Sequence, residues 1–249
     1  MNLLRCITAL LSILLSSAIW AADLTVSAAA SLTQAFQEIG TQFEAQHPAI
    51  KLKLNFAASG ALLQQIINGA PVDVFASADT DTMDKAVAKT VVNAADIKLF
   101  ASNRLVLVTP ASSKTVLNKL DDLKKPEVKR CAMGLAASVP AGHYAQTALE
   151  KAGLWLEVKD KIISTQNVRQ ALDYVVRNEV DAGFVYASDA LLMADKVQVA
   201  FQIPTPAPIQ YPIAKTAFTT KTAEVQKFIA YVQSEAGQRV LKKHGFAAP

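Results

Sequence analysis

Apolar residues follow two spacings along the chain, and the two kinds of segment alternate. Short runs that are apolar throughout, or apolar at every second position, predict β-strands. They span Leu24–Ser27, Ile50–Phe56, Val72–Phe75, Leu105–Val108, Lys129–Gly134 and Ala182–Tyr186. Between them lie segments with apolar residues three or four positions apart, which predict amphipathic helices. These segments cover residues 32–43, 62–67, 141–152, 168–178, 189–194, 223–234 and 236–243.

This alternation predicts an α/β fold, because strands that alternate with helices form mainly parallel sheets covered on both faces. Ligands of such folds bind beyond the carboxyl ends of the strands, where the next helices begin. The chain has 249 residues, which is enough for one large domain or for two lobes. Residues 202–212 are rich in proline and poor in pattern, which is typical of a connector between lobes.

Residues 1–21 have the features of a secretory signal peptide. Arg5 is their only charge, an apolar run extends from Cys6 through Leu15, and small residues precede a cleavage site expected near Ala21. The alternative is an uncleaved membrane anchor, but the apolar run is short for a membrane span. We therefore expect an exported protein that resides in the periplasm.

Composition and charge exclude several classes of protein. Hydrophobic residues make up 51% of the chain and charged residues 18%, which is typical of a globular protein and not of a disordered one. The net charge is +4, without a long basic run or an aromatic-rich basic patch, so nucleic acid is not expected as a partner. Cys131, the one cysteine beyond the signal peptide, lies in an apolar run and is expected to be a buried core residue.

Four turns between a strand and a helix are rich in potential hydrogen-bond donors. Ser31 and Gln34 have the spacing of a capping box, small residues surround Ser59, and Pro140 precedes Ala141 and Gly142. In the fourth turn, Asn167 and Gln170 have the spacing of another helix cap. Helix starts offer unpaired N–H groups and partial positive charge, and several of them together can hold an anion. A serine or asparagine at this position usually serves as a cap alone, so the turns by themselves do not decide between the two roles.

The same turns carry a resemblance to a known family. The segments Ala28–Leu32, Pro71–Asp79, Val139–Gly142, Asn167–Arg169 and Gly183–Tyr186, with the small-residue turn at Ser59, resemble in order the periplasmic molybdate-binding proteins of ABC transporters. The resemblance extends over nearly the whole chain after the signal peptide, to Tyr231–Phe246. This chain departs from the family pattern at Ala58 and Gly60, where some relatives have serines. We therefore expect Ser59 itself to contact the ligand and the hydroxyl contacts of the neighbouring positions to be lost.

The resemblance implies an architecture, a site and partners. The fold is two α/β lobes with the ligand in the cleft between them, divided as lobe I (residues 22–103 and 215–249) and lobe II (residues 104–214). The ligand is molybdate or tungstate, bound as an oxyanion by neutral donors. These donors are Ser31, Ser59, Ala141, Val168 and Tyr186. The chain acts as a monomer without a cofactor, and it delivers the anion to an ABC permease in the inner membrane.

The residues also bear on which anion is bound. A fully deprotonated tetrahedral dianion only accepts hydrogen bonds, whereas monohydrogen phosphate needs an acceptor, and none of the four turns contains an acidic residue. Asp73 and Asp79 lie near them, and we interpret both as turn and cap residues. Sulfate has the charge and shape of molybdate, so the choice between them depends on the resemblance, and molybdate and tungstate are not distinguished.

Other functions are possible on the same pattern. A binding protein for sulfate, phosphate or a small organic anion would have a similar sequence organisation. A secreted α/β hydrolase is a further alternative, but the chain lacks a Gly-x-Ser-x-Gly elbow, and we expect His47, His143 and His244 to be non-catalytic. No cluster of Cys, His and acidic residues has metal-ligand spacing, so no directly bound metal cation is expected. A transcription regulator with similar lobes would carry a DNA-binding helix-turn-helix where this chain has a signal peptide.

Overall fold

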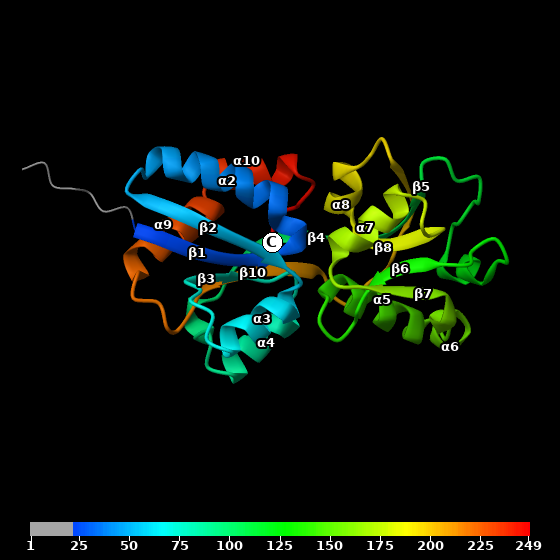
Figure 1. The fold of residues 1–249 in the computed structure, drawn as a ribbon, viewed down its shortest axis with the longest axis horizontal. Coiled ribbons are helices and arrows are strands. Elements are labelled where there is room, and N and C mark those ends of the chain that lie inside the picture. The colour runs from blue at the N-terminus through cyan, green and yellow to red at the C-terminus, as the bar shows by residue number, and fades with distance from the viewer. Residues whose placement is uncertain (1–21) are drawn as a thin grey trace, which may run out of the picture.

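The computed structural model describes residues 22–249, which form two α/β lobes side by side (Figure 1). The predicted signal peptide, including Cys6, lies outside the described residues. Each lobe has one five-stranded sheet with helices on both faces, as the sequence pattern predicted. Among residues 22–249, no helix has the length and apolar character needed to cross a bilayer.

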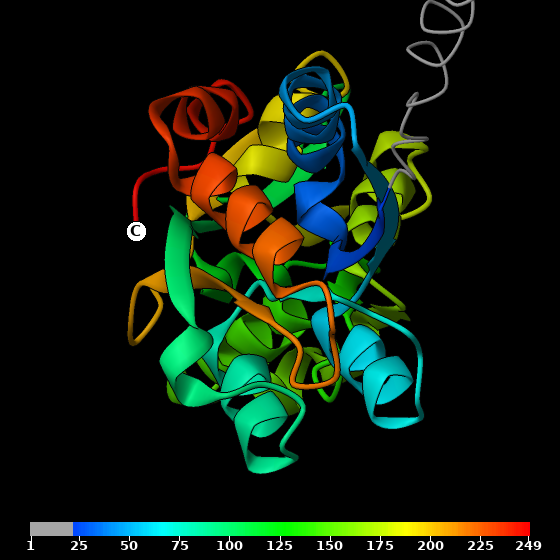
Figure 2. The ribbon, with the colours of Figure 1, turned by 90° about the vertical axis from the view of Figure 1, so that its left-hand side faces the viewer.

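Lobe I contains the N-terminal and C-terminal parts of the chain. Its sheet has the strand order β2-β1-β3-β10-β4. Its strands are β1 (Ala22–Ala29), β2 (Ile50–Ala57), β3 (Val74–Ala76), β4 (Lys98–Asn103) and β10 (Ile209–Lys215). Its helices are η1 (Ala30–Leu32), α2 (Thr33–Gln46), α3 (Ser59–Ile67), α4 (Thr80–Ala88), η2 (Ala94–Asp96), α9 (Thr222–Gln233) and α10 (Glu235–Lys243). In Figure 2, α2, α9 and α10 lie on one side of this lobe and α3 and α4 on the other.

Lobe II is formed by one continuous stretch of chain. Its sheet has the strand order β7-β6-β8-β5-β9. Its strands are β5 (Leu105–Pro110), β6 (Cys131–Gly134), β7 (Ile162–Thr165), β8 (Ala182–Tyr186) and β9 (Val197–Gln202). Its helices are η3 (Leu120–Lys124), α5 (Pro140–Lys151), α6 (Trp155–Val158), η4 (Lys159–Lys161), α7 (Val168–Val176) and α8 (Ala187–Leu192). Helices α7 and α8 cover one face of this sheet, and α5 and α6 cover the other (Figure 1).

Both sheets are mainly parallel, as the alternation of strands and helices predicted, but each contains one strand that runs in the opposite direction. In lobe I, β10 is antiparallel to β3 and β4, and in lobe II, β5 is antiparallel to β8 and β9. The reason is the route of the chain between the lobes. The parallel strands run toward the other lobe, whereas β5 and β10 enter from the other lobe and therefore run away from it. Each crossing thus adds an antiparallel strand beside the parallel ones.

The second crossing between the lobes lies earlier in the chain than predicted. The boundary was expected at residue 214, and residues 202–212 were interpreted as a connector. The structure instead places Ile209–Lys215 within the sheet of lobe I, so the connector is the segment between Gln202 and Ile209. The sequence did not predict this strand because it contains Pro212, and proline lacks the N–H that a strand donates to its neighbour in a sheet. The register of β10 against β4 shifts at Tyr211 and Pro212, and this bulge accommodates the proline.

Asp73 joins the start of β3 to the loop that follows β10, at a place away from the helix starts described above. Its buried carboxylate accepts hydrogen bonds from the Thr25 N–H (2.8 Å), the Thr219 hydroxyl (2.6 Å) and the Lys221 ammonium (2.9 Å). Burial alone would raise the pKa of Asp73, but the hydrogen bonds from Thr219, Thr25 and Lys221 hold its pKa below the ordinary value. Asp73 is therefore a structural tie, in agreement with the interpretation of this residue as a turn residue.

We expect the replacement Asp73→Asn to lower the free energy of unfolding at pH 7 by about 1.5–3 kcal/mol, the value of hydrogen bonds to a charged group. Because folding lowers the pKa of Asp73, its contribution is complete above the ordinary aspartate pKa of about 3.9 and is lost as the pH falls further. Urea unfolding of both proteins at neutral and acidic pH measures this. The difference between them should shrink in acid, and an equal difference at both pH values would contradict the assignment.

Candidate functional site

The helix starts predicted from the sequence meet at a cavity between the two lobes, here called the central cavity. Its volume is about 10 Å³, which is close to the space that a single water molecule needs. It is lined by Ala29, Ala30, Ser31, Ala58, Ser59, Ala78, Val139, Pro140, Ala141, Asn167, Val168 and Tyr186. All five predicted site residues are in this set. The lobes are therefore packed closely around these residues, and a ligand larger than a water molecule needs them to move apart.

Three helices begin at the central cavity, and each presents backbone N–H groups to it. Ser59 and Val168 are the first residues of α3 and α7, and Ala141 is the second residue of α5, after Pro140. N–H groups at these positions have no acceptor within their own helix. Asn167 caps α7 as predicted, because its side chain accepts a hydrogen bond from the Gln170 N–H at 3.0 Å. The helix starts therefore supply donors and partial positive charge without a charged side chain.

The Ser59 hydroxyl is fully buried and has one hydrogen bond to the backbone. Its Oγ accepts from the Ala78 N–H at 3.0 Å, just before α4 begins. A hydroxyl has one proton to donate, and this bond does not use it. Ser59 can therefore direct its proton into the central cavity while its oxygen is fixed by lobe I.

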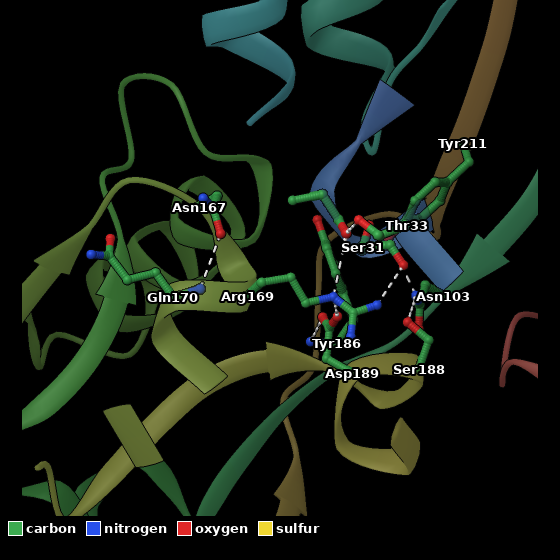
Figure 3. A network of polar contacts seen from close by, with 11 residues as sticks. Ser31, Thr33, Asn103, Asn167, Arg169, Gln170, Tyr186, Ser188, Asp189 and Tyr211 are labelled. Atoms are coloured by element: carbon green, nitrogen blue, oxygen red, sulfur yellow. Dashed lines mark hydrogen bonds and ion pairs between the residues drawn. The ribbon is translucent and has the colours of Figure 1, made fainter. Parts of the chain in front are cut away.

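Ser31 does not form the capping box that its spacing to Gln34 predicted. It lies within η1, and neither η1 nor α2 has a side-chain cap. The Ser31 hydroxyl instead lies 3.1 Å from the Tyr211 hydroxyl, which also accepts from Asn103 Nδ2 at 3.3 Å (Figure 3). With its oxygen engaged by Asn103, Tyr211 can donate its own proton to Ser31. The Ser31 proton is then available to the central cavity.

Tyr211 and Asn103 were not found from the sequence as residues that support the site. Tyr211 lies in the proline-containing strand β10, and Asn103 is the last residue of β4. Asn103 Nδ2 also donates to the Ser188 hydroxyl of α8 at 2.8 Å, so the network joins the two lobes. No local pattern marks these residues, because their partners are between 85 and 180 positions away in the chain.

Tyr186 ends β8 with its hydroxyl at the central cavity. Its side chain is buried, and its hydroxyl has no hydrogen-bond partner among the described residues. Burial raises the pKa of Tyr186 well above its ordinary value, so the hydroxyl stays neutral and can donate. Buried polar groups are almost always paired in proteins, so the unpaired hydroxyl makes Tyr186 a candidate for contact with a ligand.

The residues that line the central cavity include no charged side chain. Asp79, which precedes α4, accepts hydrogen bonds from the Ser77 hydroxyl and the Thr82 N–H, so it is the cap residue that the sequence predicted. Arg169 lies near the cavity, but its Nε is 2.9 Å from the buried carboxylate of Asp189. The site thus combines hydroxyl and N–H donors with no carboxylate acceptor, and this set suits an anion that carries no proton.

Comparison with known proteins assigns the chain to a family. Residues 24–247 match the family described as bacterial extracellular solute-binding protein. The chain belongs to this family. It is 37% identical over 228 residues to the molybdate-binding protein ModA of Escherichia coli, a match that covers 90% of this chain and 88% of that protein.

Solved structures of other solute-binding proteins have the same fold. The periplasmic molybdate-binding protein of Azotobacter vinelandii superposes with a TM-score of 0.80 at 24% identity, over 91% of this chain and 99% of that one. The sulfate-binding protein SubI of Mycobacterium tuberculosis gives a TM-score of 0.77 at 17% identity, over 91% of this chain and 87% of that one. The two-lobed fold is therefore established, and it is shared by proteins named for different anions.

The lobes of this solute-binding protein contact each other around the central cavity. The Gly60 N–H of α3 donates to the Ser138 carbonyl of lobe II at 3.0 Å. A side chain at position 60 would not fit, because its Cβ would lie 2.8 Å from the Ser138 oxygen and 2.9 Å from the Ser138 Cα. Gly60 is therefore a point of close approach between the lobes. A second contact, His143 to Asp81 at 3.5 Å, is solvent-exposed.

None of the histidines in residues 22–249, and not the cysteine Cys131, is among the residues that line the central cavity. His47 packs against Phe43 with the two rings tilted, and His244, just after α10, contacts Glu38 at 2.9 Å. Cys131 is buried in lobe II as predicted, and burial raises the pKa of its thiol far above the ordinary value. Among residues 22–249, no group of three or more His, Cys, Asp or Glu side chains has an arrangement that could hold a metal ion.

Proposed function

We propose that this solute-binding protein captures a small tetrahedral oxyanion, molybdate or tungstate, in the periplasm and delivers it to an ABC importer. One observation carries the proposal: five neutral donor residues from both lobes line one small cavity without a charged side chain. The names of the E. coli and A. vinelandii relatives support molybdate as the ligand. The molybdenum would be held through its oxo groups, and no residue would ligate it directly.

The proposed mechanism is closure of the two lobes on the anion. Ser31 and Ser59 belong to lobe I, whereas Ala141, Val168 and Tyr186 belong to lobe II. An anion that contacts both sets binds the closed arrangement more tightly than the open one, and only such a difference can shift the equilibrium. The closed form would then dock on a membrane permease. The chain's own role is binding and not catalysis.

The first test is thermal unfolding of the mature protein with molybdate, tungstate, sulfate or phosphate. A ligand at about 1,000 times its dissociation constant adds ~4 kcal/mol of stability, which is a rise in Tm of roughly 8–16 °C for a protein of this size. We expect this rise with molybdate and tungstate alone. Phosphate should have no effect, since its proton finds no carboxylate in the cavity.

The other outcomes are equally informative. A rise with sulfate would keep the site and change the ligand, because sulfate presents the same acceptors in a smaller shape. No rise with any of the four anions would contradict the proposal, and an organic anion would then be the next ligand class to test.

A further inference from the structure

Arg169 reaches across the cleft from lobe II to the backbone of lobe I. It is the second residue of α7, and its guanidinium donates from Nη2 to the Ser31 carbonyl (2.9 Å) and from Nε to the Ala30 carbonyl (3.3 Å). Its side chain is only 18% exposed, so these bonds are shielded from water. Figure 3 shows the guanidinium between the η1 turn and the residues of lobe II.

The two carbonyl groups belong to the turn that carries Ser31. A trans peptide is planar, and its N–H points opposite to its C=O. The peptide that Arg169 holds at the Ala30 carbonyl therefore directs the Ser31 N–H away from Arg169. Ser31 lines the central cavity, whereas Arg169 lies with Ser31 at a neighbouring pocket, so an N–H that points away from Arg169 can face the central cavity. The Thr33 hydroxyl donates to the same Ala30 carbonyl at 2.7 Å and restrains it further.

Asp189 holds Arg169 in place and also contacts Tyr186. Its carboxylate is fully buried, and Oδ1 lies 2.9 Å from Arg169 Nε. The hydrogen of Nε is directed to the Ala30 carbonyl, so the contact with Asp189 is electrostatic. The other oxygen of Asp189 accepts from the Tyr186 N–H at 3.1 Å. One buried ion pair thus connects the backbone of Ser31 in lobe I with the backbone of Tyr186 in lobe II.

We infer that Arg169 is a positioning residue of the anion site: with Asp189 it clamps the Ser31 turn to the Tyr186 strand end and so orients donors of both lobes in the closed form. The clamp acts through geometry and not through its charge, because Asp189 neutralises the guanidinium. A planar guanidinium can hold two carbonyls at once, whereas an ammonium cannot reproduce this fork. The inference rests on the proposed function, since the donors it orients are those of the oxyanion site.

The test compares Arg169→Lys with the wild type by calorimetry and stopped-flow kinetics, with molybdate as the probe. We expect the dissociation constant to rise by about tenfold, mainly through faster dissociation, because a clamp of the closed form acts on the bound state. The thermal stability of the ligand-free variant should stay near that of the wild type, because lysine keeps a positive charge beside Asp189. Unchanged affinity and kinetics in Arg169→Lys would overturn the inference.

A second variant covers the case in which lysine is not tolerated in the fold. The double replacement Arg169→Gln with Asp189→Asn removes both charges together, so no buried charge is left uncompensated, and we expect at least a tenfold loss of affinity, again in dissociation. His143→Ala is the matched control, since it removes the exposed contact between the lobes and should leave dissociation unchanged. Equal effects of the double variant and the control would overturn the inference. If the wild type binds none of the four anions, the proposed function fails instead, and the two failures are distinct.

Discussion

Replacing Gly60 with alanine is expected to weaken molybdate binding by about five- to 150-fold while leaving the ligand-free protein as stable as before. The new Cβ would lie within 3 Å of the Ser138 backbone in the other lobe, and overpacking of this kind costs about 1–3 kcal/mol. The clash arises only when the lobes close, so it penalises the bound form. In the open form, alanine is a better helix former than glycine, and α3 should be unharmed.

Calorimetric titration and thermal unfolding of the Gly60→Ala variant separate these two effects. Gly40→Ala is a suitable control, because it makes the same chemical change in another helix of lobe I. There the nearest atom to the new Cβ is the end of the flexible Leu52 side chain at 3.3 Å, and no contact between the lobes is affected. An unchanged dissociation constant in Gly60→Ala would mean that binding does not need the close approach of α3 to Ser138.

Replacing Tyr186 with phenylalanine is expected to weaken molybdate binding by about 1.5–3 kcal/mol, the value of a hydrogen bond to a charged partner. This corresponds to a dissociation constant roughly ten to 150 times higher. The ligand-free protein should unfold at the same temperature or slightly higher, because the hydroxyl has no partner among the described residues and its removal breaks no hydrogen bond. Binding and stability thus respond differently to one oxygen atom.

Tyr211→Phe provides the comparison for this result. Tyr211 is buried beside Tyr186, with ring centroids 5.9 Å apart, but its hydroxyl is bonded to Ser31 and Asn103. Its removal should lower the stability of the ligand-free protein by about 0.5–1.5 kcal/mol per lost hydrogen bond. If Tyr186→Phe lowered stability in the same way and left the affinity unchanged, Tyr186 would be a structural residue and not a ligand contact.

The parts of the site that the sequence revealed are those with local signals. Pro140 marks the start of α5 and Asn167 marks the start of α7, because the first residues of a helix have their own requirements for caps and φ angles. In one case the prediction from local spacing was wrong. Ser31 and Gln34 have the spacing of a capping box, but Ser31 lies within η1 and its hydroxyl forms a hydrogen bond with the Tyr211 hydroxyl. A tertiary partner prevailed over the local one.

The supporting residues could not be predicted, because their roles depend on partners far away in the chain. Arg169 stood within a recognised segment, yet nothing in the sequence indicated that its acceptors are Ala30 and Ser31, nearly 140 positions earlier. The direction of β10 was equally hidden. A strand that contains Pro212 and follows Pro204 and Pro206 has the composition of a loop, and only its pairing with β3 and β4 makes it part of the sheet.

The position of β10 late in the chain also determines the order in which the two lobes can fold during synthesis. All five strands of lobe II are present once residue 202 has been synthesised, whereas the sheet of lobe I still lacks the strand between β3 and β4. A chain that emerges N-terminus first can therefore finish its inserted lobe while the enclosing lobe keeps an unpaired edge on β3. Open strand edges are sites where chains pair wrongly with one another. Ile209–Lys215 closes this edge, so truncations before this segment should aggregate even though the first 202 residues contain every residue of the anion site.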